Sequence, residues 1–196
     1  MATEKFVVTG DQYRVIDRRM REVKRQLDQE GGSPLDPNWV AGELQRVVEG
    51  RGDSEVYPVV VDFADFLAEM IAAGKYDRIN KDITPDHFPT KGGEGRVEKD
   101  LMLVHLNCSA RTEEALKEID RLGLKPETIE SLLAFGAKFP DKQREFPIIA
   151  LGSVWQHPNG NRRVACLDED ASKRLLYLYW CEDDWYDYCR FLAARK

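Results

Sequence analysis

The segment Leu175-Leu-Tyr-Leu-Tyr-Trp180 decides the fold, because large side chains of two kinds alternate along it. One set of alternate positions is occupied by Leu176, Leu178 and Trp180. The other set is occupied by Leu175, Tyr177 and Tyr179. Successive side chains of a β-strand point to opposite sides of a sheet. The pattern therefore predicts a strand with one face in the core and a different, tyrosine-bearing face directed outward.

Segments on both sides of this strand have an extended pattern as well. The run Phe146-Pro-Ile-Ile-Ala-Leu-Gly-Ser-Val-Trp155 precedes the turn His157-Pro-Asn-Gly160, and the following residues return as the second half of a hairpin. We expect strands over residues 101–106, 146–155, 162–167, 175–180 and 188–194.

Helices are predicted before these C-terminal strands. One runs from Thr112 to Leu122 and is followed by Gly123, a residue common just after a helix end. A second opens at Pro126 and ends near Gly136. A strand, these helices and then several strands indicate an α+β fold, with two helices around a twisted antiparallel sheet.

The first eighty residues have a helical rather than an extended period. A stripe that repeats at steps of three and four predicts a helix from Asp11 onward; its members are Tyr13, Ile16, Met20, Val23 and Leu27. Asp36 with Pro37 predicts the start of a second helix. A third is expected over residues 58–73. Because residues 83–95 are rich in Pro, Gly and Thr, we expect a helical region over 1–80 and another domain over 81–196.

Composition excludes several classes of protein. A net charge of −6 argues against a dedicated nucleic-acid binder. The basic run Arg14–Arg25 is interpreted as the solvated face of a helix, with a nucleic-acid contact as the alternative. No apolar run approaches the roughly 20 residues that cross a bilayer. The first residues lack a signal-peptide pattern, so we expect cytoplasmic synthesis, with display on a virion or cell surface left open.

The 4 cysteines and 3 histidines do not have the spacing of a metal site. The sequence therefore predicts no metal and no cofactor, and free buried thiols are the default. Whether any cysteines pair stays open at this point.

The C-terminal segments resemble those of a known family. The runs Gly123–Gly136 and Phe146–Trp155, with Trp180 and Trp185 before Cys189-Arg-Phe-Leu-Ala-Ala-Arg-Lys196, are similar to the C-terminal half of variable proteins of diversity-generating retroelements. Such proteins occur in archaeal viruses, nanoarchaea and candidate-phylum bacteria, and they have a C-type-lectin fold. The resemblance covers residues 80–196 and implies a C-type-lectin-like domain there.

The resemblance also implies which positions vary. In this family a reverse transcriptase copies a template repeat with errors at adenines, and the asparagine codon AAC can then give Asp, Tyr or Leu but not Lys, Glu or Trp. Candidate variable, ligand-binding positions that hold reachable residues are Asp168, Asp170, Leu175, Tyr177, Tyr179, Asp183, Tyr186 and Tyr188. The implied framework residues are Trp155, Trp180, Trp185 and Arg190.

The sequence thus predicts a ligand-binding protein without catalytic residues, whose partner is a protein or glycan on a host or neighbouring cell. Tyrosine offers a large, rigid contact area with a polar tip, although these tyrosines are also ordinary strand residues by propensity. The alternatives are an assembly component of a viral or cell-surface particle, a thiol-dependent enzyme that uses Cys181 and Cys189, and a calcium site at Glu182–Asp184 with Asp187.

Overall fold

The computed structural model describes residues 8–29, 31–48, 56–90, 95–106 and 108–196. The chain divides into two compact units, residues 1–53 and residues 54–196. They are described separately below.

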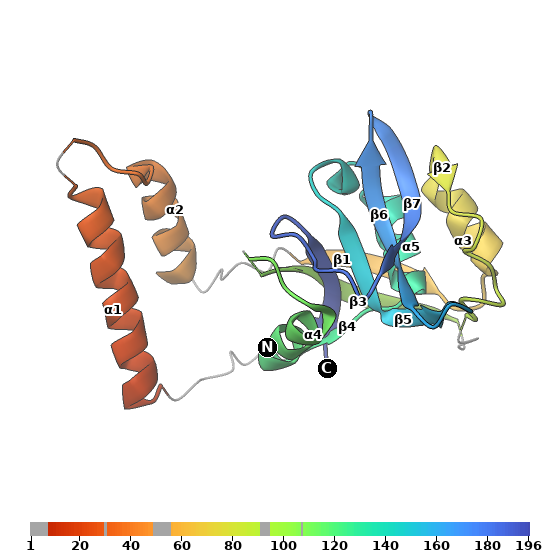
Figure 1. The fold of residues 1–196 in the computed structure, drawn as a ribbon, viewed down its shortest axis with the longest axis horizontal. Coiled ribbons are helices and arrows are strands. Elements are labelled where there is room, and N and C mark those ends of the chain that lie inside the picture. Colours follow the sequence, from red (N-terminus) through yellow and green to blue (C-terminus); the bar gives the residue numbers. More distant parts are fainter. Residues whose placement is uncertain (1–7, 30, 49–55, 91–94, 107) are drawn as a thin grey trace. The chain divides into compact units, whose positions relative to one another are not determined.

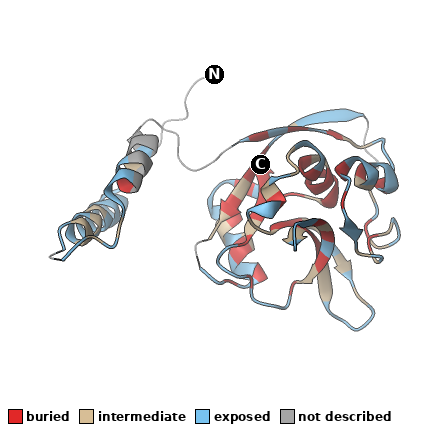
Figure 2. Cartoon of the chain, turned by 90° about the horizontal axis from the view of Figure 1, so that it is seen from above, coloured by how far each residue is buried: buried red, intermediate tan, exposed pale blue. Residues whose placement is uncertain are grey.

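The first unit contains the helices α1 (Gly10–Leu27) and α2 (Pro37–Val48), so both helices predicted here are confirmed. The side chain of Thr9 accepts a hydrogen bond from the amide of Gln12, whose own side chain accepts one from the amide of Thr9. This reciprocal capping box satisfies amides that have no partner within the helix. The Asp36 carboxylate accepts a hydrogen bond from the Asn38 amide at 2.8 Å and caps the start of α2. No residue of α1 is buried, and Figure 2 shows the helix mostly in the colour of exposed residues.

The second unit is α+β and is built on one mixed sheet (Figure 1). Its helices are α3 (Leu67–Gly74), α4 (Thr112–Arg121), α5 (Ile129–Lys138) and a 3-10 turn at Lys142–Arg144. Its strands are β1 (Tyr57–Asp62), β2 (Arg78–Ile79), β3 (Arg96–His105), β4 (Leu124–Pro126), β5 (Ile148–Gln156), β6 (Arg162–Asp170), β7 (Lys173–Trp180) and β8 (Arg190–Arg195).

The strands lie in the order β1-β3-β8-β5-β6-β7-β2, and β4 pairs with β8 beside this path. Most neighbouring strands are antiparallel, but β5 with β8 and β2 with β7 are parallel. The expectation of an antiparallel sheet is therefore wrong for these pairs. The α+β class and the helices α4 and α5 are confirmed.

Residues 57–62 correct another expectation, since they form strand β1 where a helix over 58–73 is predicted. Val59 and Val61 are buried whereas Val60 is 50% exposed, which is the period of a strand. The helix begins only at Leu67. β1 pairs with β3 along its whole length, so residues 57–62 belong to the same sheet as the C-terminal strands.

The sheet has a core on each face, visible in Figure 2 as buried residues between the sheet and the helices. On one face, α3 and α5 pack against the sheet, and their buried side chains include Leu67, Met70, Ile129, Leu132, Leu133 and Phe135. On the other face, α4 packs with Ala115 and Ile119 over a smaller area. On this second face α4 lies over β4, so β6 and β7 have no covering helix there.

Arg174 of β7 joins the strand to both helices of the larger core. Its guanidinium donates hydrogen bonds to the carbonyl oxygens of Gly74 (2.5 Å) and Gly136 (2.8 Å), and its Nε donates to Gln143 (3.1 Å). Gly74 ends α3, and Gly136 lies in the last turn of α5. Carbonyl groups at helix C-termini have no partner within the helix and carry partial negative charge. A buried cation is therefore matched here by helix ends.

Replacing Arg174 with Met should lower the free energy of unfolding by about 3 kcal/mol, because buried carbonyl groups of both helices lose a charged donor. Urea denaturation followed by circular dichroism measures this. The control is Lys173→Met on the same strand, where the side chain is exposed and a change under about 0.5 kcal/mol is expected. Equal effects of the two substitutions would contradict the role given to Arg174.

The turn between β6 and β7 is strained. Asp170 pairs with Lys173, so the turn consists of Ala171 and Ser172, and their φ angles are +49° and +67°. Such a turn favours Asn followed by Gly, because most side chains disfavour positive φ.

The double substitution Ala171→Asn with Ser172→Gly should raise the free energy of unfolding by about 0.5–1 kcal/mol. Thermal unfolding measures the effect, and Lys173→Gly, placed in the strand itself, should have the opposite sign. A double variant less stable than the parent protein would show that this turn is not strained.

Candidate functional site

Strand β7 has the two faces that its sequence predicts. Leu176 and Leu178 are buried, whereas Tyr177 is 45% exposed on the opposite face and Leu175 and Tyr179 beside it are half-buried. Trp180 differs from the expectation, because it is only half-buried and the Arg163 guanidinium lies 3.7 Å from its ring centroid. The hairpin β6–β7 thus presents Leu175, Tyr177 and Tyr179 on the same face as α4, in the part of it that α4 does not cover.

Asp168 of β6 lies on the same face, opposite Leu175 in the register. The Tyr179 hydroxyl donates a hydrogen bond to its carboxylate, and the Glu169 amide donates another at 2.8 Å. Burial raises the pKa of Tyr179, and the neighbouring Cys166 and Asp168 raise it further. Tyr179 therefore remains a hydrogen-bond donor that fixes the orientation of the carboxylate.

The loop between β7 and β8 adds an exposed pair of aromatic rings. Tyr186 and Tyr188 are 64% and 52% exposed, and their rings stack with centroids 5.4 Å apart and an interplanar angle of 9°. Between Tyr186 and β7, Trp185 is buried in the smaller core. Its indole N–H donates to the Thr112 hydroxyl at 3.0 Å, and its backbone exchanges hydrogen bonds with Ala110. The loop is therefore anchored at the start of α4.

Arg190 holds the other end of this loop. Its guanidinium donates to the carbonyl oxygens of Tyr188 (2.9 Å) and Cys189 (3.3 Å) and lies over the ring of Phe146 at 4.5 Å. Burial lowers the pKa of Arg190. The exposed tyrosines thus stand between a buried tryptophan and a partly buried arginine.

We treat the outward side chains of the hairpin and the exposed tyrosines of the following loop together as one candidate surface. Burial raises the pKa of Tyr188, and the charge of Asp168 on β6 contributes to the same shift. The buried thiol of Cys189 likewise has its pKa raised by burial and by Asp168. We define the tyrosine face as the residues of this patch, Asp168, Leu175, Tyr177, Tyr179, Tyr186 and Tyr188.

Two candidate residues lie at the margins of this patch. Asp170 is next to the hairpin turn, and its carboxylate pairs with Arg78 at 3.3 Å. Asp183 is exposed on the loop after β7. They could contact a ligand that covers more than the tyrosine face itself.

The last framework candidate, Trp155, is half-buried and packs against the larger core, where it contacts residues that the sequence analysis does not assign. The His87 ring stacks on Trp155 with centroids 3.9 Å apart, and His157 packs edge-on against both Trp155 and Trp180. These contacts join the 83–90 segment to the base of the hairpin. No local sequence signal links His87 to Trp155, because the contact spans distant parts of the chain.

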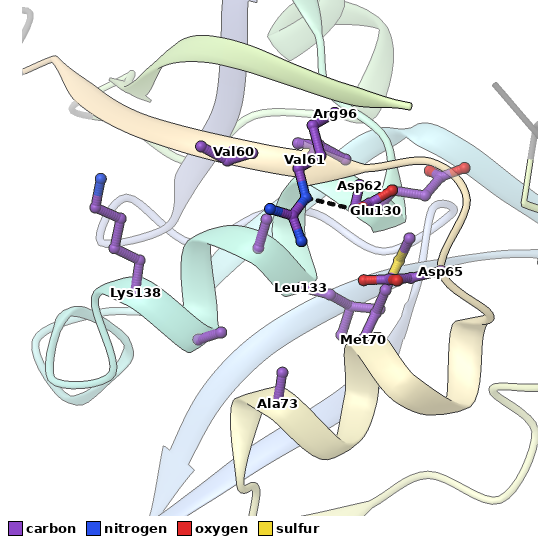
Figure 3. A pocket seen from close by; sticks show the side chains of 12 residues that line it. Val60, Val61, Asp62, Asp65, Met70, Ala73, Arg96, Glu130, Leu133 and Lys138 are labelled. Carbon is purple, nitrogen blue, oxygen red and sulfur yellow. Dashed lines mark hydrogen bonds and ion pairs between the residues drawn. The ribbon is translucent and has the colours of Figure 1, made fainter. Parts of the chain in front are cut away.

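A pocket of about 570 Å³ opens on the other side of the sheet, between β1, α3 and α5 (Figure 3). Its walls include Val61, Met70, Leu133 and several alanines, and charged side chains stand at both ends. The sequence analysis misses it, since it assigns a helix to residues that form β1. The small residues Ala73 of α3 and Ala134 and Ala137 of α5 were a signal for this pocket. They leave space between two helices that elsewhere pack through larger side chains.

The three buried thiols are not in a nucleophilic environment. Burial raises the pKa of Cys181 to about 11 and also raises the pKa values of Cys166 and Cys189. A reactive cysteine needs the opposite shift. In the part of the chain that the structure describes, no cluster of His, Cys, Asp and Glu side chains could hold a metal ion, and no helix is long and apolar enough to span a membrane.

Comparison of the chain with protein families, curated proteins and solved structures finds no match. The fold and the site are therefore interpreted from their own geometry.

In native protein at pH 8, the exposed Cys108 should react rapidly with a thiol reagent, while Cys166, Cys181 and Cys189 should react only on unfolding. Their burial and raised pKa values leave little thiolate at this pH. Absorbance titration with and without denaturant, with the modified site located by mass spectrometry, checks this. Rapid labelling of Cys181 or Cys189 in folded protein would favour the thiol-enzyme alternative.

Proposed function

We propose that the tyrosine face is a ligand-binding surface and that the protein recognises a protein or glycan on a host or neighbouring cell. The observation that carries the proposal is the exposure of Tyr177, Tyr186 and Tyr188 on strand β7 and a loop that are held by the buried residues Leu176, Leu178 and Trp185. Large exposed aromatic rings that gather in one patch are unusual on a surface without a partner.

The arrangement suits binding for physical reasons. Tyrosine gives a large contact area for a small loss of rotamer freedom, and its hydroxyl adapts to polar partners. Trp185 and Arg190 hold the loop at its two ends. On the hairpin, the hydrogen bond between Tyr179 and Asp168 fixes the orientation of both side chains. Less freedom is therefore lost when a ligand binds.

The fold and the origin of this surface are part of the same proposal. Residues 81–196 have a C-type-lectin-like arrangement, and the eight candidate positions are diversified through adenine mutagenesis directed by a retroelement. This is supported by the resemblance of the C-terminal segments and by the position of the variable candidates, which lie at exposed or half-buried sites. Trp185, which the adenine rule excludes from variation, is buried.

A second candidate function, assembly into a viral or cell-surface particle, is favoured by one observation. Helix α1 has no buried residue, although Tyr13 and Ile16 of its apolar stripe are 70% and 55% exposed. The stripe is exposed in the first half of the helix, whereas Met20, Val23 and Leu27 farther along are half-buried. An amphipathic helix with an exposed apolar segment commonly packs against another molecule. Anchoring through the first unit and recognition through the second are compatible.

A variable surface must tolerate change, so replacing Leu175, Tyr177, Tyr186 and Tyr188 together with Ser should cost less than about 1 kcal/mol of folding free energy. The control Trp185→Ser should cost about 3–5 kcal/mol, because it empties a buried site and removes the anchor. Denaturant unfolding measures both. If the surface variant loses as much as the control, these residues support the fold and the proposal fails.

Binding itself can be tested with a displayed library in which the eight candidate positions are randomised. Selection against an arbitrary folded protein should yield specific binders from this library. A control library with eight randomised, exposed charged positions on α1 should yield none of comparable affinity. Equal success of the two libraries would show that the tyrosine face has no special aptitude for binding.

A further inference from the structure

Helix α1 has the spacing of apolar residues that is typical of helices that pack against one another. Its apolar stripe occupies positions 13, 16, 20, 23 and 27, at alternating steps of three and four. In a coiled coil such residues form the seam, and the polar residues on the two flanks of the seam set the choice of partner. One flank of α1 carries Asp17 and Lys24. The other carries Gln12, Arg19 and Gln26.

The stripe is incompletely covered within its own unit. No residue of α1 is buried, although α2 belongs to the same compact unit. Gln26 on one flank is half-buried, whereas Asp17 and Lys24 on the other flank are exposed. Tyr13 and Ile16 of the stripe are exposed as well. The flank with Asp17 and Lys24 and the first half of the stripe are therefore open to another molecule.

The first unit also needs more apolar packing than it has. α1 has 18 residues and α2 has 12. Helices shorter than about 12–15 residues are marginal in water on their own, and most of their stability in proteins comes from burial of an apolar face. Among the described residues of this unit, Val40 is the only buried apolar residue. A partner that covers the stripe of α1 would supply the missing burial.

The charges of α1 indicate the chemistry of this partner. Three of its acidic residues pair with arginines of the same helix, in the pairs Asp11–Arg14, Asp17–Arg21 and Glu22–Arg25. A helix that binds an anionic membrane or a nucleic acid carries a basic polar face. Charges of alternating sign are typical instead of a helix that packs with other helices. The partner is therefore expected to be a helix.

A second copy of α1 matches the stripe in the antiparallel orientation. When Met20 of one copy lies opposite Val23 of the other, Ile16 lies opposite Leu27. Twofold symmetry repeats both contacts. Each apolar residue from position 16 to position 27 then meets an apolar residue of the other copy.

The same register brings opposite charges together. Like flanks meet in an antiparallel pair, so Asp17 of each copy faces Lys24 of the other. The Asp17 carboxylate accepts a hydrogen bond from Arg21 at 2.6 Å through Oδ2, and its other oxygen can accept a second donor. Lys24 forms no ion pair in the part of the chain that the structure describes.

Other arrangements of the two helices bring like charges together. A shift of one heptad would set Asp17 against Asp17 and Arg19 against Arg19. A parallel pair would set Arg19 against Lys24 at both flanks. Like charges in direct opposition disfavour a pairing, so the charges of α1 select the antiparallel register with Asp17 opposite Lys24.

We propose that the protein forms a dimer in which the α1 helices of two copies pack antiparallel along the flank that carries Asp17 and Lys24. The proposal names a second copy of this chain as the partner of α1, and it rests on the second candidate function, assembly, only in its use of α1 as a contact surface. It does not depend on the tyrosine face. A dimer carries two tyrosine faces, and linked sites raise the apparent affinity for a surface that displays many ligands.

Sedimentation equilibrium of the full chain between about 1 and about 100 µM tests the proposal. The mass should rise from that of one chain to that of two chains as the concentration increases. Ile16→Asp should raise the dissociation constant at least about tenfold, because a carboxylate then replaces an apolar side chain in the interface. The matched control is Val15→Asp, at an exposed apolar position outside the stripe, and it should dimerise like the parent protein.

Reversal of the charges tests the register. Asp17→Lys and Lys24→Asp should each weaken dimerisation about tenfold, because like charges then face each other twice. An equimolar mixture of the two variants should dimerise at least as tightly as the parent protein, since both facing pairs become Lys with Asp. Mixing would not rescue a variant whose α1 had simply unfolded, and circular dichroism of each variant checks its helix content.

A parent protein that stays monomeric over this concentration range would overturn the proposal and leave the assembly function to a partner of another kind. Equal effects of Ile16→Asp and Val15→Asp would overturn it as well, because α1 would not provide the interface through its stripe. A mixture of the two charge variants that remains monomeric would overturn the antiparallel register. Binding through the tyrosine face is measured separately and is unaffected by these outcomes.

Discussion

The buried guanidinium of Arg174 is the contact on which the second unit depends most. It satisfies carbonyl groups at the ends of α3 and α5, and a hydrogen bond from the Arg174 amide to the Asp77 carboxylate at 2.7 Å joins the same strand to the segment before β2. A buried cation without partners would be strongly unfavourable. The helices α3 and α5 and the strand β7 must therefore pack together. The side chains of β7 that point into the larger core hold the strand in place.

Fixing one face of β7 determines what the other face offers. Side chains alternate across a strand, so the contacts of Arg174, Leu176 and Leu178 direct Leu175, Tyr177 and Tyr179 to the uncovered side. The loop that follows is fastened by Trp185 at the start of α4, and it carries the stacked rings of Tyr186 and Tyr188. The outward side chains of β7 are thus held in place by the contacts that its inward side chains make in the larger core. Substitutions on the outer face need not disturb those contacts.

Several helices and strands could be predicted from the pattern within their own segment. The alternation over residues 175–180, the apolar run over 146–155 and the helices near residues 112 and 129 each follow from local periodicity and end signals. Residues 58–62 were misassigned because Val60 and Phe63 also fit a helical spacing, and only pairing with β3 decides for a strand. The parallel pairs, the Arg174 contacts and the His87–Trp155 stack join distant segments, so no window of sequence contains them. Of the candidate site, the outward direction of Tyr177 was predictable, whereas the Tyr179–Asp168 hydrogen bond and the pocket required the three-dimensional arrangement.

The central claim, that the tyrosine face is a diversified binding surface, is tested most directly by sequencing the DNA at and beyond the 3′ end of the gene. We predict a near-copy of the segment that encodes the C-terminal residues, close to a gene for a reverse transcriptase, with differences confined to adenines of the copy. Those differences should fall on the codons of the eight candidate positions and spare the codons of Trp180 and Trp185. A 3′ region without such a repeat would contradict diversification, and a repeat whose differences fall on codons of buried residues would contradict the surface assigned here.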